Sequence, residues 1–290
     1  QLDRGGEEIP ILYFLERMKQ EASRSGGAVH VLNGNHETMN VMGNFRYADP
    51  TAKHDFRRWY LLQQLGANLK KRCGVEPGLR EVPRLSQCPE GLNPDLCARY
   101  LALRPRGPLT QRFLAPNPTV LQVGGNVFVH GGVLPHHVQY GLERINAETT
   151  EWMLGERRAE VGEDPRSVIP EFLLGARAVV WARDYSNKPE RCKCDVLTEA
   201  LDAIPGGDRM IMGHTIQSPG INSSCDGRAM RIDVGMSAGC ADAQPEVLEI
   251  LDDDKVYRLV QQGDRVVRVP VEEAVPKRKA TDVPPSRVAA

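Results

Sequence analysis

The amino-acid sequence predicts an α/β protein, also describable as α+β, with mixed sheets flanked by helices. Three short apolar runs, at residues 29–32, 127–129 and 210–212, have the length and composition of buried strands. Each run is followed within a few residues by a histidine beside glycine or asparagine, namely His36, His130 and His214. Ligand crevices in α/β sheets lie beyond the carboxyl ends of strands, so these three histidines indicate metal ligation or catalysis rather than buried structural roles.

The remaining elements follow from periodicity and turn residues. A helix is predicted from about Pro10 to the Gly26-Gly27 pair, with a buried face made of Ile11, Phe14, Leu15, Met18 and Ala22. Further helices are predicted over residues 56–65, 142–153 and 195–204, where apolar residues recur every three or four positions. Strands are predicted as a pair over residues 119–129, at 179–181 and 230–234, and as a meander over 247–271 with a turn at 252–254.

The domain organisation is predicted from changes in composition. Residues 1–251 form a catalytic domain, interrupted at about 44–118 by an insertion rich in proline, glycine and arginine that covers the edge of the site. A solvated surface explains the basic residues of this insertion better than the steering of an anionic substrate does. Residues 252–275 form C-terminal strands, and residues 276–290 form a disordered tail rich in lysine, arginine and proline.

Charge and hydropathy exclude some classes of function. The net charge is −1, which gives no support for nucleic-acid binding. No run of about twenty apolar residues is present, so no membrane span is predicted. The chain opens on Gln1 rather than methionine, so a native N-terminus with any targeting segment is expected to be missing. A soluble protein of the cytoplasm or an organelle is therefore expected, and the compartment is left open.

The seven cysteines fit no standard zinc motif. Their number is odd, and only one residue separates Cys192 from Cys194, which is too close for the usual zinc knuckle. Free buried thiols are the favoured interpretation, with redox control of some pair as the alternative.

Four short motifs occur in order along the chain and together form a recognisable pattern. They are Asp3-Arg4-Gly5, Gly34-Asn35-His36-Glu37, His130-Gly131-Gly132 and Gly213-His214-Thr215. This pattern resembles the calcineurin-like metallophosphoesterases of the phosphoprotein phosphatase superfamily. Longer stretches, at residues 33–41, 45–47, 130–138 and 231–237, are similar to the Shewanella-like protein phosphatases. The resemblance implies a central β-sandwich of mixed sheets flanked by helices.

The resemblance also implies a set of site residues. Metal ligands would be Asn35, His130 and His214, and these nitrogen and oxygen donors suit manganese, iron or zinc. His36 would be the general acid and Asp3 would orient it, while Arg4 and, less directly, Arg183 would bind the phosphate. Two divalent metals in the complete protein would hold the phosphomonoester and supply a bridging hydroxide for attack.

The sequence departs from the family pattern at its start. The aspartate that bridges both metals would immediately precede Gln1, and the motif that supplies the other ligands of the first metal is absent. The chain as given is therefore expected to lack the first strand of the fold, to hold at most one metal weakly, and to be inactive.

Two alternatives to a phosphoprotein phosphatase stay open. One is a hydrolase of dinucleoside polyphosphates or other nucleotides, and the other is an inactive relative that acts as a binding module. A phosphoprotein is the expected substrate, but the residues do not choose between phosphotyrosine and phosphoserine or phosphothreonine. They also do not indicate an oligomeric state.

Overall fold

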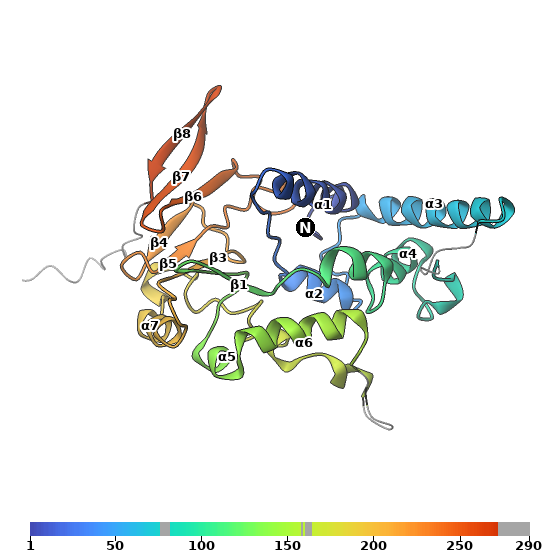
Figure 1. The fold of residues 1–290 in the computed structure, drawn as a ribbon, viewed down its shortest axis with the longest axis horizontal. Helices are drawn as coiled ribbons and strands as arrows, with labels where there is room; N and C mark the ends of the chain where they lie inside the picture. The colour runs from blue at the N-terminus through green and yellow to red at the C-terminus, as the bar shows by residue number, and fades with distance from the viewer. Residues whose placement is uncertain (76–81, 158, 160–163, 272–290) are drawn as a thin grey trace, which may run out of the picture.

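The computed structural model describes residues 1–75, 82–157, 159 and 164–271, so the predicted tail at 276–290 lies outside the described residues. Its larger sheet has the strand order β1-β2-β3-β5-β4 (Figure 1). The strands are β1 (Val120–Val123), β2 (Asn126–Val129), β3 (Arg209–Met212), β4 (Asn222–Ser224) and β5 (Ala229–Arg231). The central strands β2, β3 and β5 run parallel, while β1 and β4 pair antiparallel at the two edges. A mixed sheet of this kind places the ends of β2 and β3 at one edge.

A second, antiparallel sheet contains β6 (Glu246–Leu251), β7 (Lys255–Gln262) and β8 (Arg265–Pro270). It confirms the predicted meander, and its first turn contains Asp252, Asp253 and Asp254. This turn contacts the larger sheet, because Asn126 Nδ2 donates to Asp253 Oδ1 at 2.8 Å and Arg209 Nη1 donates to the Asp253 carbonyl at 3.1 Å. The mixed α/β fold class is therefore confirmed.

In Figure 1, α5, α6 and α7 lie below the larger sheet, whereas α1, α2, α3 and α4 lie to its right. The α-helices are α1 (Glu8–Arg24), α2 (Asn35–Val41), α3 (Ala52–Arg72), α4 (Pro94–Leu103), α5 (Pro135–Tyr140), α6 (Leu142–Leu154) and α7 (Cys194–Asp202). Shorter helical turns are η1 (Leu85–Gln87), η2 (Thr110–Leu114), η3 (Pro165–Val168), η4 (Glu171–Leu173) and η5 (Pro189–Arg191). Among the described residues, no helix has the length and hydropathy of a membrane span.

Helix α1 buries a different face from the one that its sequence predicts. Ile11 and Phe14 are exposed, whereas Ile9 and Leu12 are buried in the main core. The reason is that the first turn of α1 also buries Glu8, whose carboxylate pairs with an arginine of α4. The buried ion pair of Glu8, rather than the most apolar face of the helix, therefore determines which side of α1 packs against the core.

Two of the predicted strands are wrong. Residues 29–32 form no strand and residues 179–181 lie in a turn, although both are rich in valine. A strand needs a hydrogen-bonded neighbour, and the first segment pairs with no strand among the described residues. In the second, Trp181 and Ala182 instead donate their backbone N–H groups to the Ala178 carbonyl.

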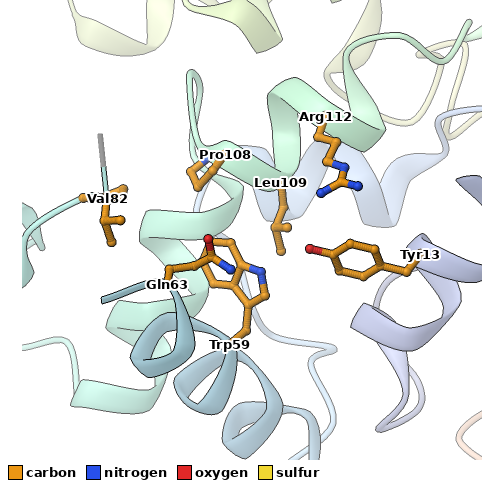
Figure 2. Close-up of a pocket in the computed structure, with 8 residues that line it drawn as sticks. Tyr13, Trp59, Gln63, Val82, Pro108, Leu109 and Arg112 are labelled. Carbon is orange, nitrogen blue, oxygen red and sulfur yellow. The ribbon is translucent and has the colours of Figure 1, made fainter. Parts of the chain in front are cut away.

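The predicted insertion contains α3, η1, α4 and η2, and it packs against α1. Tyr13 of α1 and Trp59 of α3 line a small pocket at this contact (Figure 2). Tyr13 also packs edge-on against Phe113 of η2, with ring centroids 5.0 Å apart. The insertion is thus part of the core rather than only a cover for the site.

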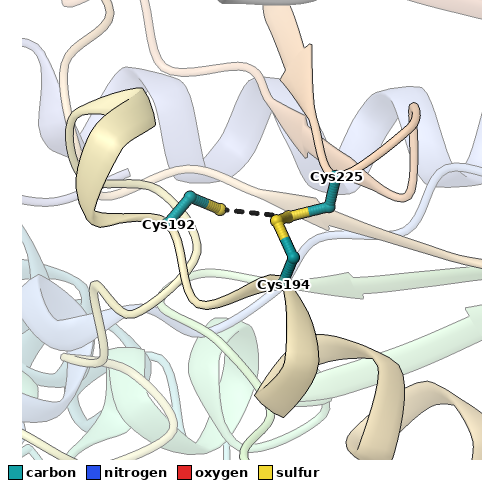
Figure 3. A group of neighbouring side chains, drawn as sticks. All are labelled: Cys192, Cys194 and Cys225. Atoms are coloured by element: carbon teal, nitrogen blue, oxygen red, sulfur yellow. Dashed lines mark hydrogen bonds between the residues drawn. A yellow bond between two sulfur atoms is a disulfide. The ribbon is translucent and has the colours of Figure 1, made fainter. Parts of the chain in front are cut away.

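Four of the seven cysteines form disulfides, so the expectation of free buried thiols is wrong for them. Cys88 pairs with Cys97, and Cys194 pairs with Cys225, with Cα–Cα separations of 5.7 and 5.3 Å that suit disulfide geometry. Figure 3 shows the second pair with Cys192, whose sulfur lies 3.3 Å from that of Cys225. The Cys194–Cys225 pair could not be predicted from the sequence, because it depends on the fold. The turn after β4 brings Cys225 to the start of α7.

The Cys194–Cys225 disulfide is expected to stabilise the folded protein measurably. Replacing both cysteines by serine should lower the free energy of unfolding by about 3–4 kcal/mol, because the bridge closes a 31-residue separation. Urea unfolding of the oxidised protein measures this loss. The matched control is Cys73→Ser, which changes an exposed free thiol. A double variant as stable as this control would contradict the prediction.

Candidate functional site

His130 and His214 reach the same point because β2 and β3 pair in parallel. Val129 and Met212, the last residues of the two strands, are partners in the pairing register. His130 follows β2 directly, and His214 follows β3 after one glycine, with a left-handed backbone (φ 65°) that turns the chain. Both histidines therefore lie at the carboxyl edge of the sheet, where α/β proteins bind ligands.

The third member of this cluster comes from the start of a helix. The predicted polar turn at residues 35–37 is the first turn of α2, and Glu37 caps it by accepting the backbone N–H of Gly34 at 2.8 Å. A Cβ on Gly34 would lie 2.8 Å from the ring of His130. Glycine at this position therefore allows the His130 ring to approach Asn35.

Asn35, His130 and His214 form one compact group. Asn35 Oδ1 lies 2.6 Å from His130 Nε2, which in turn lies 3.1 Å from His214 Nδ1. Asn35 is buried, and the Trp181 and His214 rings meet at right angles with their centroids 5.5 Å apart. The structure thus brings together the three residues that the motifs predict as metal ligands.

The electrostatics of this group keep both histidines neutral at pH 7. Burial lowers the pKa of His130 to about 4, although the Glu37 carboxylate opposes the shift. Burial and the neighbouring His130 and Arg183 lower the pKa of His214 to about 3. Two neutral imidazole nitrogens and an amide oxygen directed at one another form a donor set that fits manganese, iron or zinc. The residues present therefore fit one ion of the predicted pair.

His36 lies beside this group and contacts Asp3. His36 Nδ1 lies 2.7 Å from Asp3 Oδ2, and the His36 side chain is 23% exposed whereas that of Asp3 is fully buried. This contact leaves Nε2 as the ring nitrogen that can meet a substrate. Asp3 has a left-handed backbone (φ 66°), which turns its carboxylate toward α2 and α4. The pair has the arrangement of a proton donor and the residue that orients it.

A buried network that the sequence does not predict holds Asp3 in place. Arg99 of α4 donates from Nη2 to Asp3 Oδ1 at 2.9 Å and from Nε to Asn40 Oδ1 at 2.8 Å. Asn40 Nδ2 also donates to Asp3 Oδ1, at 3.0 Å, and Arg99 pairs with Glu8. The sequence feature that could have indicated this network is a single arginine inside the apolar sequence of α4.

The two predicted phosphate arginines lie near different histidines of the site. Arg183 Nη1 donates to the His214 carbonyl at 3.0 Å and to Thr215 Oγ1 at 2.8 Å. Its neighbour Asp184 pairs with Lys193 instead, so it does not neutralise Arg183. The Arg4 guanidinium stacks 4.4 Å above the Tyr47 ring, whose centroid lies 5.3 Å from that of His36.

Arg46 adds a third guanidinium near the site, and the motifs assign it no functional role. It lies 4.8 Å from the centroid of Tyr47 and 5.9 Å from that of Trp181. The two aromatic rings thus connect the His36 side of the site with the His214 side. Cationic groups close to one another and to aromatic faces are suited to an anionic ligand.

Comparison with known proteins first establishes the fold. No protein-family model matches the sequence. A solved cold-active protein tyrosine phosphatase superposes with a TM-score of 0.60 at 19% identity, over 94% of this chain and 66% of that one. A cold-active protein tyrosine phosphatase of a psychrophilic Shewanella species gives a TM-score of 0.53 at 17% identity, over 89% and 64% of the two chains. The chain therefore has the fold of these phosphatase structures.

Comparison with known sequences then identifies homologues of the chain. Shewanella-like protein phosphatase 2 of Arabidopsis thaliana is 47% identical over 265 residues, which cover 88% of this chain. Shewanella-like protein phosphatase 1 of Plasmodium berghei is 26% identical over 258 residues, or 85% of this chain. The chain is a homologue of the Shewanella-like protein phosphatases, as its motifs predicted. It spans 65% of the Arabidopsis relative and 59% of the Plasmodium relative.

Proposed function

We propose that this chain is the catalytic part of a protein phosphatase that hydrolyses phosphomonoesters. The observation that carries the proposal is the convergence of Asn35 Oδ1, His130 Nε2 and His214 Nδ1 beside His36 and two arginines. Because the chain spans 65% of its Arabidopsis relative, the activity is proposed for a longer protein, here called the extended protein, in which the bridging aspartate and the first metal motif of the resemblance precede Gln1. The 290 residues alone are proposed to hold at most one metal and to be inactive.

Different residues of this chain would have different roles in the reaction. Asn35, His130 and His214 would hold a divalent metal, which neutralises phosphate charge and activates water when it is bound. Arg4 and Arg183 bind phosphate oxygens, for which a guanidinium offers paired donors in a fixed geometry. His36 donates the Nε2 proton to the departing alkoxide or phenoxide oxygen as its bond to phosphorus breaks. Asp3 holds the His36 ring in the orientation that this transfer requires.

Phosphotyrosine is the proposed substrate residue. The names of the two solved structures that share the fold support it, because both are protein tyrosine phosphatases. The Tyr47 and Trp181 rings near the histidines support it as well, because aromatic faces pack favourably against a phenyl leaving group.

A substrate panel tests the proposed function. The extended protein should hydrolyse a phosphotyrosine peptide faster than a phosphothreonine peptide of the same sequence, and it should leave a dinucleoside polyphosphate intact. A chelator should abolish release of inorganic phosphate, and added manganese should restore it, because the donor set binds such ions. Faster cleavage of the dinucleotide would favour the nucleotide hydrolase instead. Full activity of the metal-free protein after chelation would contradict the proposed role of the metal.

A further inference from the structure

Two adjoining pockets on the insertion form one groove that the proposed reaction does not use. The smaller, here called the ring pocket, has a volume of about 110 Å³ and includes Tyr13, Trp59 and Arg112 in its wall. The larger, here called the arginine groove, has a volume of about 620 Å³ and includes Arg84, Arg104 and Arg106. Val82, Pro83 and Pro108 line both pockets, so a single ligand can occupy them together.

The ring pocket contains a buried donor without an acceptor. Trp59 is 8% exposed, and its indole Nε1 has no hydrogen-bond partner among the described residues. Figure 2 shows this nitrogen and the Tyr13 hydroxyl pointing toward the space beside Leu109. An indole N–H can only donate, and leaving such a group unpaired is unfavourable. The nitrogen itself has almost no solvent-accessible area, so an acceptor oxygen of a ligand would reach it after a small shift of the Tyr13 or Leu109 side chain in the pocket wall.

The ring pocket also offers aromatic side chains that a ligand can contact. The Arg112 guanidinium lies 4.8 Å from the centroid of the Tyr13 ring and is held there by Glu16, at 2.8 and 2.7 Å. Because Glu16 already neutralises Arg112, the walls of this pocket combine aromatic and apolar side chains with the polar Gln63 and carry little net charge. An aromatic side chain packs well against such walls.

Within the described part of the chain, no carboxylate compensates the positive charge of the arginine groove. No aspartate or glutamate is among the described residues that line either pocket. Arg84, Arg104 and Arg106 form no salt bridge with the described residues, and Arg104 Nη2 donates only to the neutral Gln87 Oε1, at 3.0 Å. A ligand with carboxylates beside its aromatic group would complement this charge.

We propose that this groove is a docking site for an acidic peptide segment of another protein, with an aromatic side chain in the ring pocket and carboxylates on the three arginines. A nucleic acid also combines rings with negative charge. The chain as a whole opposes that ligand, because its 37 basic residues are balanced by 38 acidic ones. This docking site is independent of the proposed phosphatase chemistry.

Fluorescence polarisation with labelled peptides tests the docking site. The probe is the pentapeptide Glu-Glu-Phe-Glu-Glu, with Glu-Glu-Ala-Glu-Glu and Lys-Lys-Phe-Lys-Lys as comparison peptides. Loss of the aromatic ring should weaken binding about fivefold or more, and the lysine peptide should not bind. Raising the salt concentration to about 0.3 M should weaken binding several-fold, because exposed charges are screened.

Two variants separate the contributions of charge and hydrogen bonding. Arg84→Glu should weaken binding of the acidic peptide about tenfold, whereas Arg24→Glu should leave it unchanged. Arg24 is an exposed arginine that lies eleven positions, or about 16 Å, along α1 from Tyr13. Trp59→Phe keeps an aromatic ring but removes the N–H, and it should weaken binding about threefold or more.

Several results would overturn the docking site. Equal binding of the acidic and lysine peptides would do so, and so would an Arg84→Glu protein that binds as well as the Arg24→Glu protein. Because Arg84 is exposed, its replacement tests the proposal even where Trp59→Phe destabilises the fold. If a labelled oligothymidylate bound more tightly than the acidic peptide, the groove would be a nucleic-acid site and the peptide proposal would be wrong.

Discussion

Replacing His36 with asparagine in the extended protein is expected to lower kcat toward a phosphotyrosine peptide by about 10²–10⁴-fold. The reason is that His36 is the exposed end of a pair whose other member, Asp3, is fully buried and holds the ring through Nδ1. Asparagine keeps a polar side chain near Asp3 but carries no proton that it can transfer. Steady-state release of inorganic phosphate measures the loss.

The leaving group provides a sharper version of the same experiment. A nitrophenyl phosphate releases a more acidic phenol than tyrosine, so its departure depends less on a proton donor. The loss caused by His36→Asn should therefore be smaller with this substrate than with the phosphotyrosine peptide. His30→Asn is the matched control, because His30 is an exposed histidine six positions earlier in the chain. Equal losses with both substrates would assign His36 to binding instead of proton transfer.

The proposed ligands could be predicted from sequence because their placement depends on local features. His130 and His214 each directly follow, or nearly follow, an apolar strand. Parallel pairing of these two strands then suffices to bring the residues together. The placement of Asn35 depends only on the glycine before it and on the helix that begins at it. Each of these features extends over a few residues, which is the range that a motif covers.

Features that depend on distant partners could not be predicted in the same way. Residues 29–32 and 179–181 have the composition of strands, but strand formation depends on a neighbour that composition does not reveal. The exposed Ile11 and Phe14 of α1 follow from the pairing of Glu8 with Arg99, which lie 91 positions apart. The sequence therefore predicted only that the insertion covers the edge of the site, whereas one of its helices supplies the arginine that holds Asp3.

Replacing Arg99 with methionine is expected to lower the free energy of unfolding by about 3–5 kcal/mol, because it leaves buried carboxylates without their partner. Arg99 is fully buried and contacts Asp3 and Glu8, whose side chains are 0% and 2% exposed. Methionine has an unbranched chain that fills part of the same space, so loss of charge is the main change. Urea unfolding measures the difference.

Two further variants show whether the loss arises from buried charge. Arg57→Met removes an exposed arginine that pairs with Asp95 at 3.2 Å, and it should cost about 0–1 kcal/mol. Adding Glu8→Gln to Arg99→Met removes one uncompensated carboxylate while keeping an acceptor for the Asp3 backbone N–H, so it should restore part of the stability. If Arg99→Met lowered the free energy of unfolding no more than Arg57→Met, the buried network around Asp3 would not contribute to stability as proposed. A large loss that Glu8→Gln did not relieve would point to packing around the Phe56 ring, whose centroid lies 4.6 Å from the guanidinium carbon.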